Sequence, residues 1–230
     1  MTFRGMKMNS YYTSKLTEKE RGIWDHACVI FEELLDELNA RGLLRLNASQ
    51  EDREKLALIW ENSRNYGMAF NEIQKIFDSG ESVEEFAAKS GLNTHILTYI
   101  CISQLVSVML LSYESVFKTS LLFFLKEEQG FRKNMTLGQL LQAIKKISPS
   151  VGDKIDKLVN TKIRNSVAHG TFWFKEGGKV FLARNSHLEE VEEISLADFW
   201  IEAKKINIIA TAFIETLLQK IKQYSSSQWF

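Results

Sequence analysis

The chain has 230 residues, of which 45% are hydrophobic and 25% are charged, and its formal net charge is zero. This length suits one domain, or one domain with a sizeable extension, and the hydrophobic content is ordinary for a globular protein. A net charge of zero argues against a protein that binds polyanions through its overall charge. The single proline, Pro149, and the scarcity of turn-forming clusters favour a mainly helical fold.

The first residues lack the apolar stretch that a signal peptide needs, so we expect a cytoplasmic protein. Cys28 and Cys101 are isolated cysteines that belong to no Cys-x-x-Cys pair and no zinc-type spacing. We therefore expect two buried thiols in a reducing compartment. The sequence also lacks a phosphate-binding glycine loop, a His-Glu-x-x-His motif and a Gly-x-Ser-x-Gly motif.

Charged residues are distributed unevenly along the chain. Residues 1–115 contain 12 Lys and Arg against 17 Asp and Glu, whereas residues 116–170 contain 10 against 4. A basic segment of this kind is either a solvated helix face or a surface that holds a phosphate backbone. The candidates for phosphate contacts are Lys145, Lys146, Lys154, Lys157, Lys162 and Arg164.

Capping patterns predict three helices in residues 1–92, which read as a helical pair with a short connector and show no catalytic pattern. The predicted helices run from Thr17 to about Arg41, from Ser49 towards Phe77, and from Ser82 to Gly91.

A long apolar helix is predicted from Asn93 or Thr94 to about Gln129. Apolar residues cover most of its circumference, which is typical of a helix packed on several sides. Polar side chains interrupt it, so we expect a central buried helix rather than a membrane span. One of them, Glu114, is costly to bury unless it is paired. If Glu114 is buried, its partner is Arg164 or Lys118. Alternatively, the Glu114 side chain is exposed, or it forms only a local i,i+4 pair with Lys118.

An amphipathic helix is predicted between the turn at Pro149 and Gly170. Gly170 stands where a helix normally stops, because glycine takes the left-handed C′ conformation without steric cost. A capping box of Thr136 and Gln139 begins a shorter helix ahead of it. The apolar residues of the amphipathic helix recur at helical spacing: Val151, Ile155, Leu158, Val159, Ile163 and Val167.

Arg164, Asn165 and His169 crowd the last turn and a half of this helix. At about 100° per residue, Asn165 and His169 lie within about 40° of each other, whereas Arg164 and His169 are about 140° apart. Arg164 and His169 therefore converge only if the last turn unwinds at Gly170, or if a second copy of the helix contributes.

Beyond Gly170, aromatic and β-branched residues flank a glycine pair, which predicts a β-hairpin of residues 171–174 and 179–183. Trp173 in this hairpin stacks on a nucleic-acid base or, alternatively, packs onto the helices. A pattern from Ser195 to Asp198 begins a last helix. The sequence assigns no role to three histidines, His26, His95 and His187.

The run Arg164-Asn165-x-x-x-His169 at the end of a helix resembles the signature of the HEPN family, in which an arginine precedes a histidine by four to six residues and Asn, Asp or His often follows the arginine. The Thr136-Leu137-Gly138 helix start is similar to one common in that family. The resemblance implies an all-α, HEPN-like bundle over residues 93–230. Residues 1–92 are then an N-terminal helical region, either a regulatory extension or part of the bundle, and the β-hairpin read from the residue pattern follows the motif helix. The resemblance also implies a homodimer.

Many members of this family are metal-independent RNases of toxin–antitoxin, abortive-infection and CRISPR systems. The resemblance therefore implies RNA as substrate, Arg164, Asn165 and His169 as catalytic residues and Glu114 as a supporting residue. We expect Lys154, Lys157, Lys162 and Trp173 to bind RNA, with no cofactor and no metal. An antitoxin or nucleotidyltransferase partner is implied by the same resemblance.

The chemistry of the residues agrees with this interpretation. RNA carries its own nucleophile, the 2′-hydroxyl, and imidazole exchanges a proton near neutral pH. A guanidinium is always charged and suits the phosphate oxygens. The alternative is a non-catalytic nucleotide-binding or protein-interaction module, in which Arg164 and His169 only stabilise the helix end.

Overall fold

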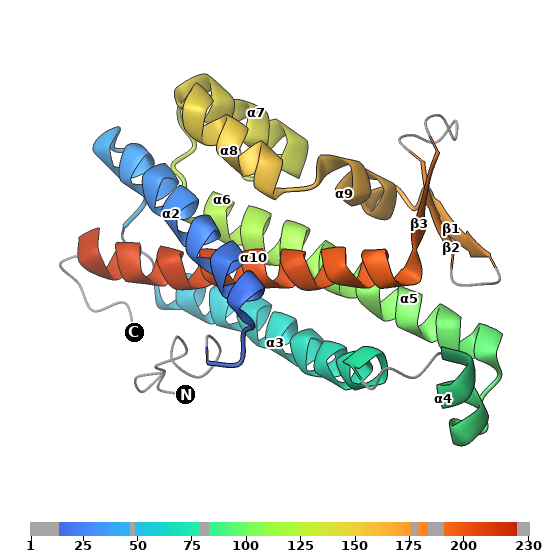
Figure 1. Ribbon diagram of the computed structural model, residues 1–230. Helices are drawn as coiled ribbons and strands as arrows, with labels where there is room; N and C mark the ends of the chain where they lie inside the picture. The colour runs from blue at the N-terminus through green and yellow to red at the C-terminus, as the bar shows by residue number, and fades with distance from the viewer. Residues whose placement is uncertain (1–13, 47–48, 79–82, 176–178, 184–190, 225–230) are drawn as a thin grey trace. The chain divides into compact units, whose positions relative to one another are not determined.

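The computed structural model describes residues 14–46, 49–78, 83–175, 179–183 and 191–224, and helices dominate it (Figure 1). The expected helical class is therefore confirmed at the level of a mainly helical protein with one small sheet. The chain forms two compact units that alternate along the sequence. The first unit comprises residues up to 59, 113–159 and 208 onward, and the second comprises 60–112 and 160–207. The division predicted at residue 92 stays a prediction.

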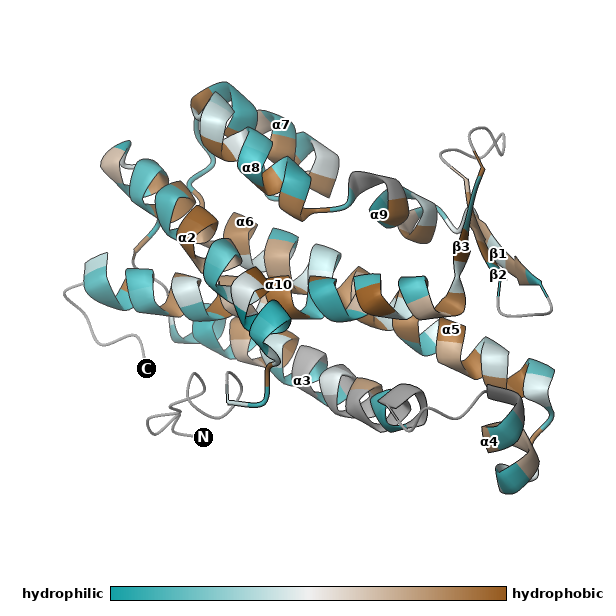
Figure 2. Ribbon diagram, in the orientation of Figure 1, coloured by the Kyte–Doolittle hydropathy of each residue, from teal (hydrophilic) through white to brown (hydrophobic). Residues whose placement is uncertain are grey.

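The first unit begins with α2 (Glu18–Ala40) and the start of α3 (Gln50–Asp78). Both predicted helix starts are confirmed: Thr17 and Glu20 form a reciprocal capping box, and the backbone N–H of Asp52 donates to Ser49 Oγ at 3.1 Å. Hydrophobic and hydrophilic residues alternate along α2 in Figure 2, as an amphipathic helix requires. Its buried side packs through Phe31, whose ring lies 5.6 Å from Phe117 and 5.1 Å from Phe213.

The long apolar helix has three parts: α5 (Thr94–Leu110), a π-helical segment η1 (Leu111–Thr119) and α6 (Ser120–Phe124). Asn93 caps its start, as predicted, by accepting from the N–H of His95 at 2.9 Å. By length and composition, Thr94–Phe124 is the one described helix that could cross a membrane, and 44% of its most apolar window is buried within the protein. The same test is passed by core helices of soluble proteins.

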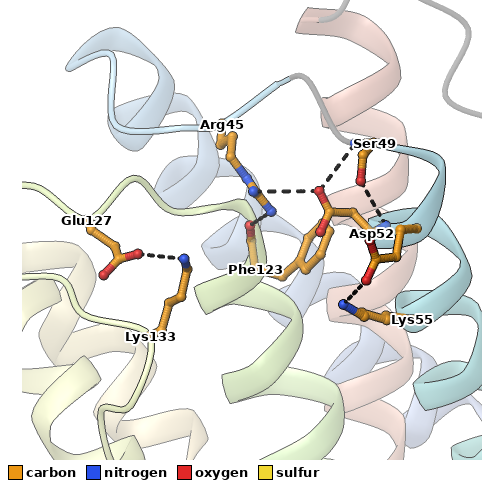
Figure 3. A network of polar contacts seen from close by, with 8 residues as sticks. Arg45, Ser49, Asp52, Lys55, Phe123, Glu127 and Lys133 are labelled. Atoms are coloured by element: carbon orange, nitrogen blue, oxygen red, sulfur yellow. Dashed lines mark hydrogen bonds and ion pairs between the residues drawn. The ribbon is translucent and has the colours of Figure 1, made fainter.

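The prediction that this helix continues to Gln129 was wrong, because it ends at Phe124. Leu125 is extended and forms a β-bridge with Leu44, and the N–H of Arg45 donates to the carbonyl oxygen of Phe124 at 2.7 Å. The Arg45 guanidinium donates to the Phe123 carbonyl at 3.0 Å and lies 3.6 Å from an Asp52 carboxylate oxygen (Figure 3). Pairing with the α2–α3 connection thus ends the helix before its sequence pattern does.

α7 (Leu137–Ile147) and α8 (Pro149–Leu158) form a helical hairpin in the first unit. The predicted capping box of Thr136 and Gln139 is present. A Cβ atom added to Gly152 would lie 2.8 Å from the Cα of Lys145, so only glycine permits this close approach of the two backbones. The Lys145 ammonium also bridges the hairpin, at 3.0 Å from Asp153 and 3.1 Å from Asp156.

The prediction of one continuous helix from Pro149 to Gly170 was wrong. The chain leaves helical geometry at Val159, with φ −84° and ψ 102°, and a new helix α9 (Thr161–Ala168) follows. Asn160 begins α9, because its side-chain oxygen accepts from the N–H of Ile163 at 3.3 Å. This break coincides with the boundary between the first and second units.

The second unit holds α4 (Val83–Ser90), α9 and an antiparallel sheet of β1 (Phe172–Lys175), β2 (Lys179–Leu182) and β3 (Glu192–Ser195) in the order β1-β2-β3. The predicted hairpin is β1–β2; β3 was not predicted. The last helix, α10 (Leu196–Tyr224), begins where expected, with the N–H of Asp198 donating to Ser195 Oγ at 3.0 Å.

Candidate functional site

The motif helix α9 ends in a Schellman motif. The N–H of Thr171 donates to the Ser166 carbonyl at 2.9 Å, and the N–H of Gly170 donates to the Val167 carbonyl at 3.3 Å. Gly170 has φ +65°, which confirms the predicted left-handed C′ position. His169 is therefore the last residue before the chain reverses, with φ −96° and ψ 0°.

A buried hydroxyl network fixes this helix end to the sheet. Ser166 is fully buried, and its Oγ donates to the carbonyl oxygen of Ala183 at 2.7 Å. Thr171 Oγ1 donates to the same oxygen at 2.9 Å, and the N–H of Ala183 donates back to the Thr171 carbonyl at 2.9 Å. Ser166 and Thr171 thus hold the reversal after His169 against the end of β2. Sequence reasoning missed both residues, because a serine on a helix carries no signal that its partner lies across the chain.

The three motif residues differ in exposure. His169 is exposed, whereas Arg164 and Asn165 are half-buried. A guanidinium Nη1 of Arg164 donates to Asn165 Oδ1 at 2.7 Å, which joins the two neighbouring side chains. An exposed imidazole can reach a bound polymer, while a half-buried guanidinium retains a fixed direction. The structure therefore brings Arg164 and Asn165 together and leaves His169 accessible beside the Gly170 turn.

Helix α9 packs on α5 within the second unit, and its apolar residues Ile163 and Val167 are buried. At its other end, the amide nitrogen of Asn160 donates to a carboxylate oxygen of Glu202 on α10 at 3.4 Å. α9 is thus held by its apolar face and at both ends, although it has only 8 residues.

Glu114 lies in the first turn of η1, in the first unit, and forms an ion pair with Lys118 at 2.5 Å. This contact is the local i,i+4 pair with Lys118 that the sequence offered as an alternative to a supporting role. The hydroxyl of Thr119 donates to the Glu114 carbonyl at 2.7 Å, five residues back, as π-helical geometry allows. A supporting role of Glu114 in catalysis stays a prediction.

The predicted RNA-binding residues have different surroundings. Lys154 is half-exposed and pairs with Glu33 of α2 at 2.5 Å, whereas Lys157 is exposed on α8. The side chain of Lys162 lies outside the described residues. Trp173 is half-buried on β1 and stacks on Phe181, which is directly opposite on β2, at 5.6 Å and an interplanar angle of 7°. Trp173 therefore packs across the hairpin, with part of its ring still exposed.

Among the remaining histidines, His26 is exposed on α2, and His95 is exposed on α5 with its ring 5.8 Å from Phe174. His187 lies outside the described residues. Both cysteines are free thiols; Cys101 is buried and Cys28 is half-buried. Burial raises the pKa of each thiol above its ordinary value, which keeps both protonated and unreactive.

Within the described ranges, no group of three or more His, Cys, Asp or Glu side chains is arranged to hold a metal ion. Comparisons with protein-family models, curated proteins and solved structures found no match to this chain. The class that the fold itself defines is a mainly helical protein whose helix α9 presents an Arg-Asn pair and an accessible histidine.

Proposed function

We propose that this protein is a metal-independent endoribonuclease of the HEPN type, with its catalytic domain in residues 93–230. The observation that carries the proposal is the end of α9, where exposed His169 follows the joined side chains of Arg164 and Asn165. A Schellman turn and the Ser166–Ala183 hydrogen bond hold that end in place. Pre-organised groups of this kind cost little reorganisation when charge develops on a substrate.

The proposed reaction uses the substrate's own nucleophile. The 2′-oxygen attacks the adjacent phosphorus, a base takes the hydroxyl proton, the bond from phosphorus to the 5′-oxygen breaks, and an acid gives that oxygen a proton. His169 transfers the protons, and Arg164 stabilises the additional negative charge on the phosphate oxygens. Asn165 orients the guanidinium, because its Oδ1 already accepts from Arg164 Nη1 at 2.7 Å.

We propose a homodimer for a chemical reason. The motif supplies one histidine per chain, whereas the reaction needs a base and an acid at the same phosphate. At the regular spacing of a helix, Arg164 and His169, which caps the end of α9, are also about 140° apart, so the two groups of one chain do not share a face. His169 from each of two copies supplies both proton-transfer groups.

The protein then acts in the cytoplasm as a toxin or antiviral effector, with an antitoxin or nucleotidyltransferase as a regulating partner.

The decisive experiment is cleavage of a fluorescent RNA by purified wild type, Arg164→Ala and His169→Ala, with and without EDTA. We expect either substitution to lower the rate by about 10²–10⁴-fold, the usual contribution of a proton-transfer group such as His169 or a charge-stabilising group such as Arg164, and EDTA to have no effect. His26→Ala removes another exposed histidine and is the matched control, with unchanged activity. Full activity of His169→Ala in a folded protein would refute the proposal. In a bacterial host, wild type but not His169→Ala should arrest growth.

A second candidate function is a non-catalytic interaction module of the same fold. The observation that favours it is an exposed apolar face at the start of α5, where Ile96 is 54%, Tyr99 59% and Ile100 44% exposed. Large exposed apolar residues grouped on one helix face typically mark an interface. This candidate predicts dimerisation without cleavage of any RNA, and a loss of stability in both Arg164→Ala and His169→Ala.

A further inference from the structure

The first unit contains an open cavity of about 770 Å³ between the loop after α6 and the exposed side of α7. Its size falls within the range of pockets that hold small organic ligands. Its lining contains two cations, Arg132 and Lys146, several amide side chains and no Asp or Glu. We propose that this cavity binds a phosphate ester, with the phosphate held between Arg132 and Lys146.

The charge pattern of the basic segment supports this assignment. Many of its cations are neutralised: Lys133 lies 2.8 Å from Glu127 (Figure 3), and Lys145 lies 3.0 Å from Asp153. Arg132 and Lys146 are both exposed, and neither forms an ion pair with any residue in the described ranges. Part of the positive charge left after internal pairing therefore falls at this cavity, where it attracts an anion.

The amide groups determine the organic part of the ligand. Gln129, Asn134, Gln139 and Gln142 line the cavity and offer both donors and acceptors. The Oε1 atom of Gln139 accepts from the N–H of Thr136 at 2.9 Å, so the amide NH₂ of Gln139 is the group that can turn to a ligand. A ligand with hydroxyl or heterocyclic polar groups beside its phosphate matches such a lining better than an apolar chain does.

The cavity is a different site from the α9 motif, because all its lining residues belong to the first unit and the motif belongs to the second. The inference therefore does not require RNA cleavage. The phosphate ester has two sources with the same chemistry: a free small molecule such as a nucleotide, or the phosphodiester backbone of an RNA strand. Binding through two cations should weaken as salt rises, because each contact releases counterions.

The test uses the full chain and two probes, ADP and a 2′-O-methyl RNA hexamer that cannot be cleaved, with affinities from isothermal titration calorimetry. We expect at least one probe to bind, and Arg132→Gln with Lys146→Gln to weaken it by at least tenfold. Binding of ADP alone identifies a free ester, and binding of RNA alone identifies the backbone. No binding of either probe at millimolar concentration, or undiminished binding by the double variant, would overturn the proposal.

Gly138 offers a matched pair of variants. A Cβ added there meets only Thr136 Oγ1, at 3.9 Å, so alanine fits without strain. Gly138→Ala should keep the affinity within about twofold, since one methyl group in open space removes no contact. Gly138→Glu places a carboxylate in the first turn of α7, where negative charge is favourable for the helix, but in the lining of the cavity that also holds both cations. The Gly138→Glu variant should fold with an unchanged or higher Tm, and its affinity for the bound probe should fall at least tenfold. Retained affinity would refute the position assigned to the phosphate.

The outcome is separable from that of the proposed function. His169→Ala should lose RNA cleavage and keep wild-type affinity for the bound probe, whereas the Arg132 and Lys146 variants should lose probe affinity and keep their fold. A protein that binds the probe at this cavity but never cleaves RNA would refute the nuclease proposal alone.

Discussion

The hydroxyl of Ser166 and the hydroxyl of Thr171 both donate to one carbonyl oxygen, that of Ala183, at 2.7 Å and 2.9 Å. One residue lies inside α9 and the other follows the Gly170 turn, so the shared acceptor joins both sides of the helix end to β2. The position of His169, between them in the chain, depends on this junction.

Removing either hydroxyl alone should cost about 1 kcal/mol in the free energy of unfolding, because the other donor still satisfies the Ala183 carbonyl. The double variant, Ser166→Ala with Thr171→Val, leaves the Ala183 carbonyl without either hydroxyl donor. The loss of unfolding free energy in the double variant should therefore exceed the sum of the losses in the two single variants by about 0.5–3 kcal/mol. Urea unfolding of the four proteins measures this coupling. Strict additivity would show that the two hydroxyls act independently.

Gly170→Ala should destabilise the protein by about 1 kcal/mol or slightly more, since φ at this position is +65° and a Cβ atom disfavours that conformation. Gly170→Asn should cost less, because asparagine tolerates the left-handed region better than other residues do. No atom lies within 4 Å of a Cβ added at Gly170, so the effect is conformational rather than steric. Thermal unfolding of both variants checks the order, and an alanine variant as stable as wild type would contradict it.

Gly152→Ala should destabilise the α7–α8 hairpin by about 1–3 kcal/mol, the usual cost of forcing atoms into a packed contact. The added Cβ would lie 2.8 Å from the Cα of Lys145, a backbone atom that cannot turn aside. Gly138→Ala, in the neighbouring helix, is the matched control and should be neutral or slightly stabilising. Chemical denaturation measures the unfolding free energies of the two variants, and equal values for Gly152→Ala and Gly138→Ala would contradict the prediction.

Asp36 should contribute to stability at neutral pH and lose that contribution in acid. Burial acts to raise the pKa of its carboxyl group, but hydrogen bonds from Tyr224 and Lys220 outweigh burial and lower the pKa below its ordinary value. A lowered folded-state pKa stabilises the protein above the unfolded-state value, and this stabilisation disappears as pH falls through the folded-state pKa. The unfolding free energy of Asp36→Asn should therefore vary less with pH below about 4. Asp25→Asn, on the exposed side of the same helix, serves as control.

Ile96→Glu with Tyr99→Glu should raise the dimer dissociation constant by at least about tenfold, if the exposed face of α5 contacts the second copy, because burying two carboxylates in an apolar contact is costly. These residues are 54% and 59% exposed, so the monomer should fold normally. Sedimentation velocity measures the dissociation constant, and RNase activity should fall with the dimer. Leu58→Glu, at an α3 position that is 66% exposed, is the control. A variant that remains dimeric would exclude this face of α5 as the dimer interface.

The sequence predicted the beginnings of the helices well, since a capping box involves residues three positions apart and forms without the rest of the protein. Thr17, Ser49, Asn93 and Thr136 all cap as expected. The Gly170 stop and the hairpin that follows it were predicted for the same reason, because both are set by local backbone conformation.

The predictions failed where distant residues compete with local preference. The periodic apolar residues from Val151 to Val167 indicated one helix, but the helix breaks at Val159 and a second helix begins after Asn160. The break lies at the boundary of the two units, and the Asn160 amide also donates to the distant Glu202 at 3.4 Å. The apolar helix was expected to reach Gln129, but Leu125 pairs with Leu44 instead. Strand β3 has a short, acidic sequence and forms by pairing with β2, where Lys179 meets Glu193 at 2.6 Å.

The order of residues alone determined which side chains stand at the end of α9 and that the helix must stop at Gly170, because those features depend on neighbours in the chain. Only the tertiary structure decided that Ser166 is tied to Ala183 and that His169 is exposed. It also decided that Arg132 and Lys146 face one cavity without a counterion among the described residues. Burial and charge pairing are properties of surfaces brought together by folding, and no local pattern contains them.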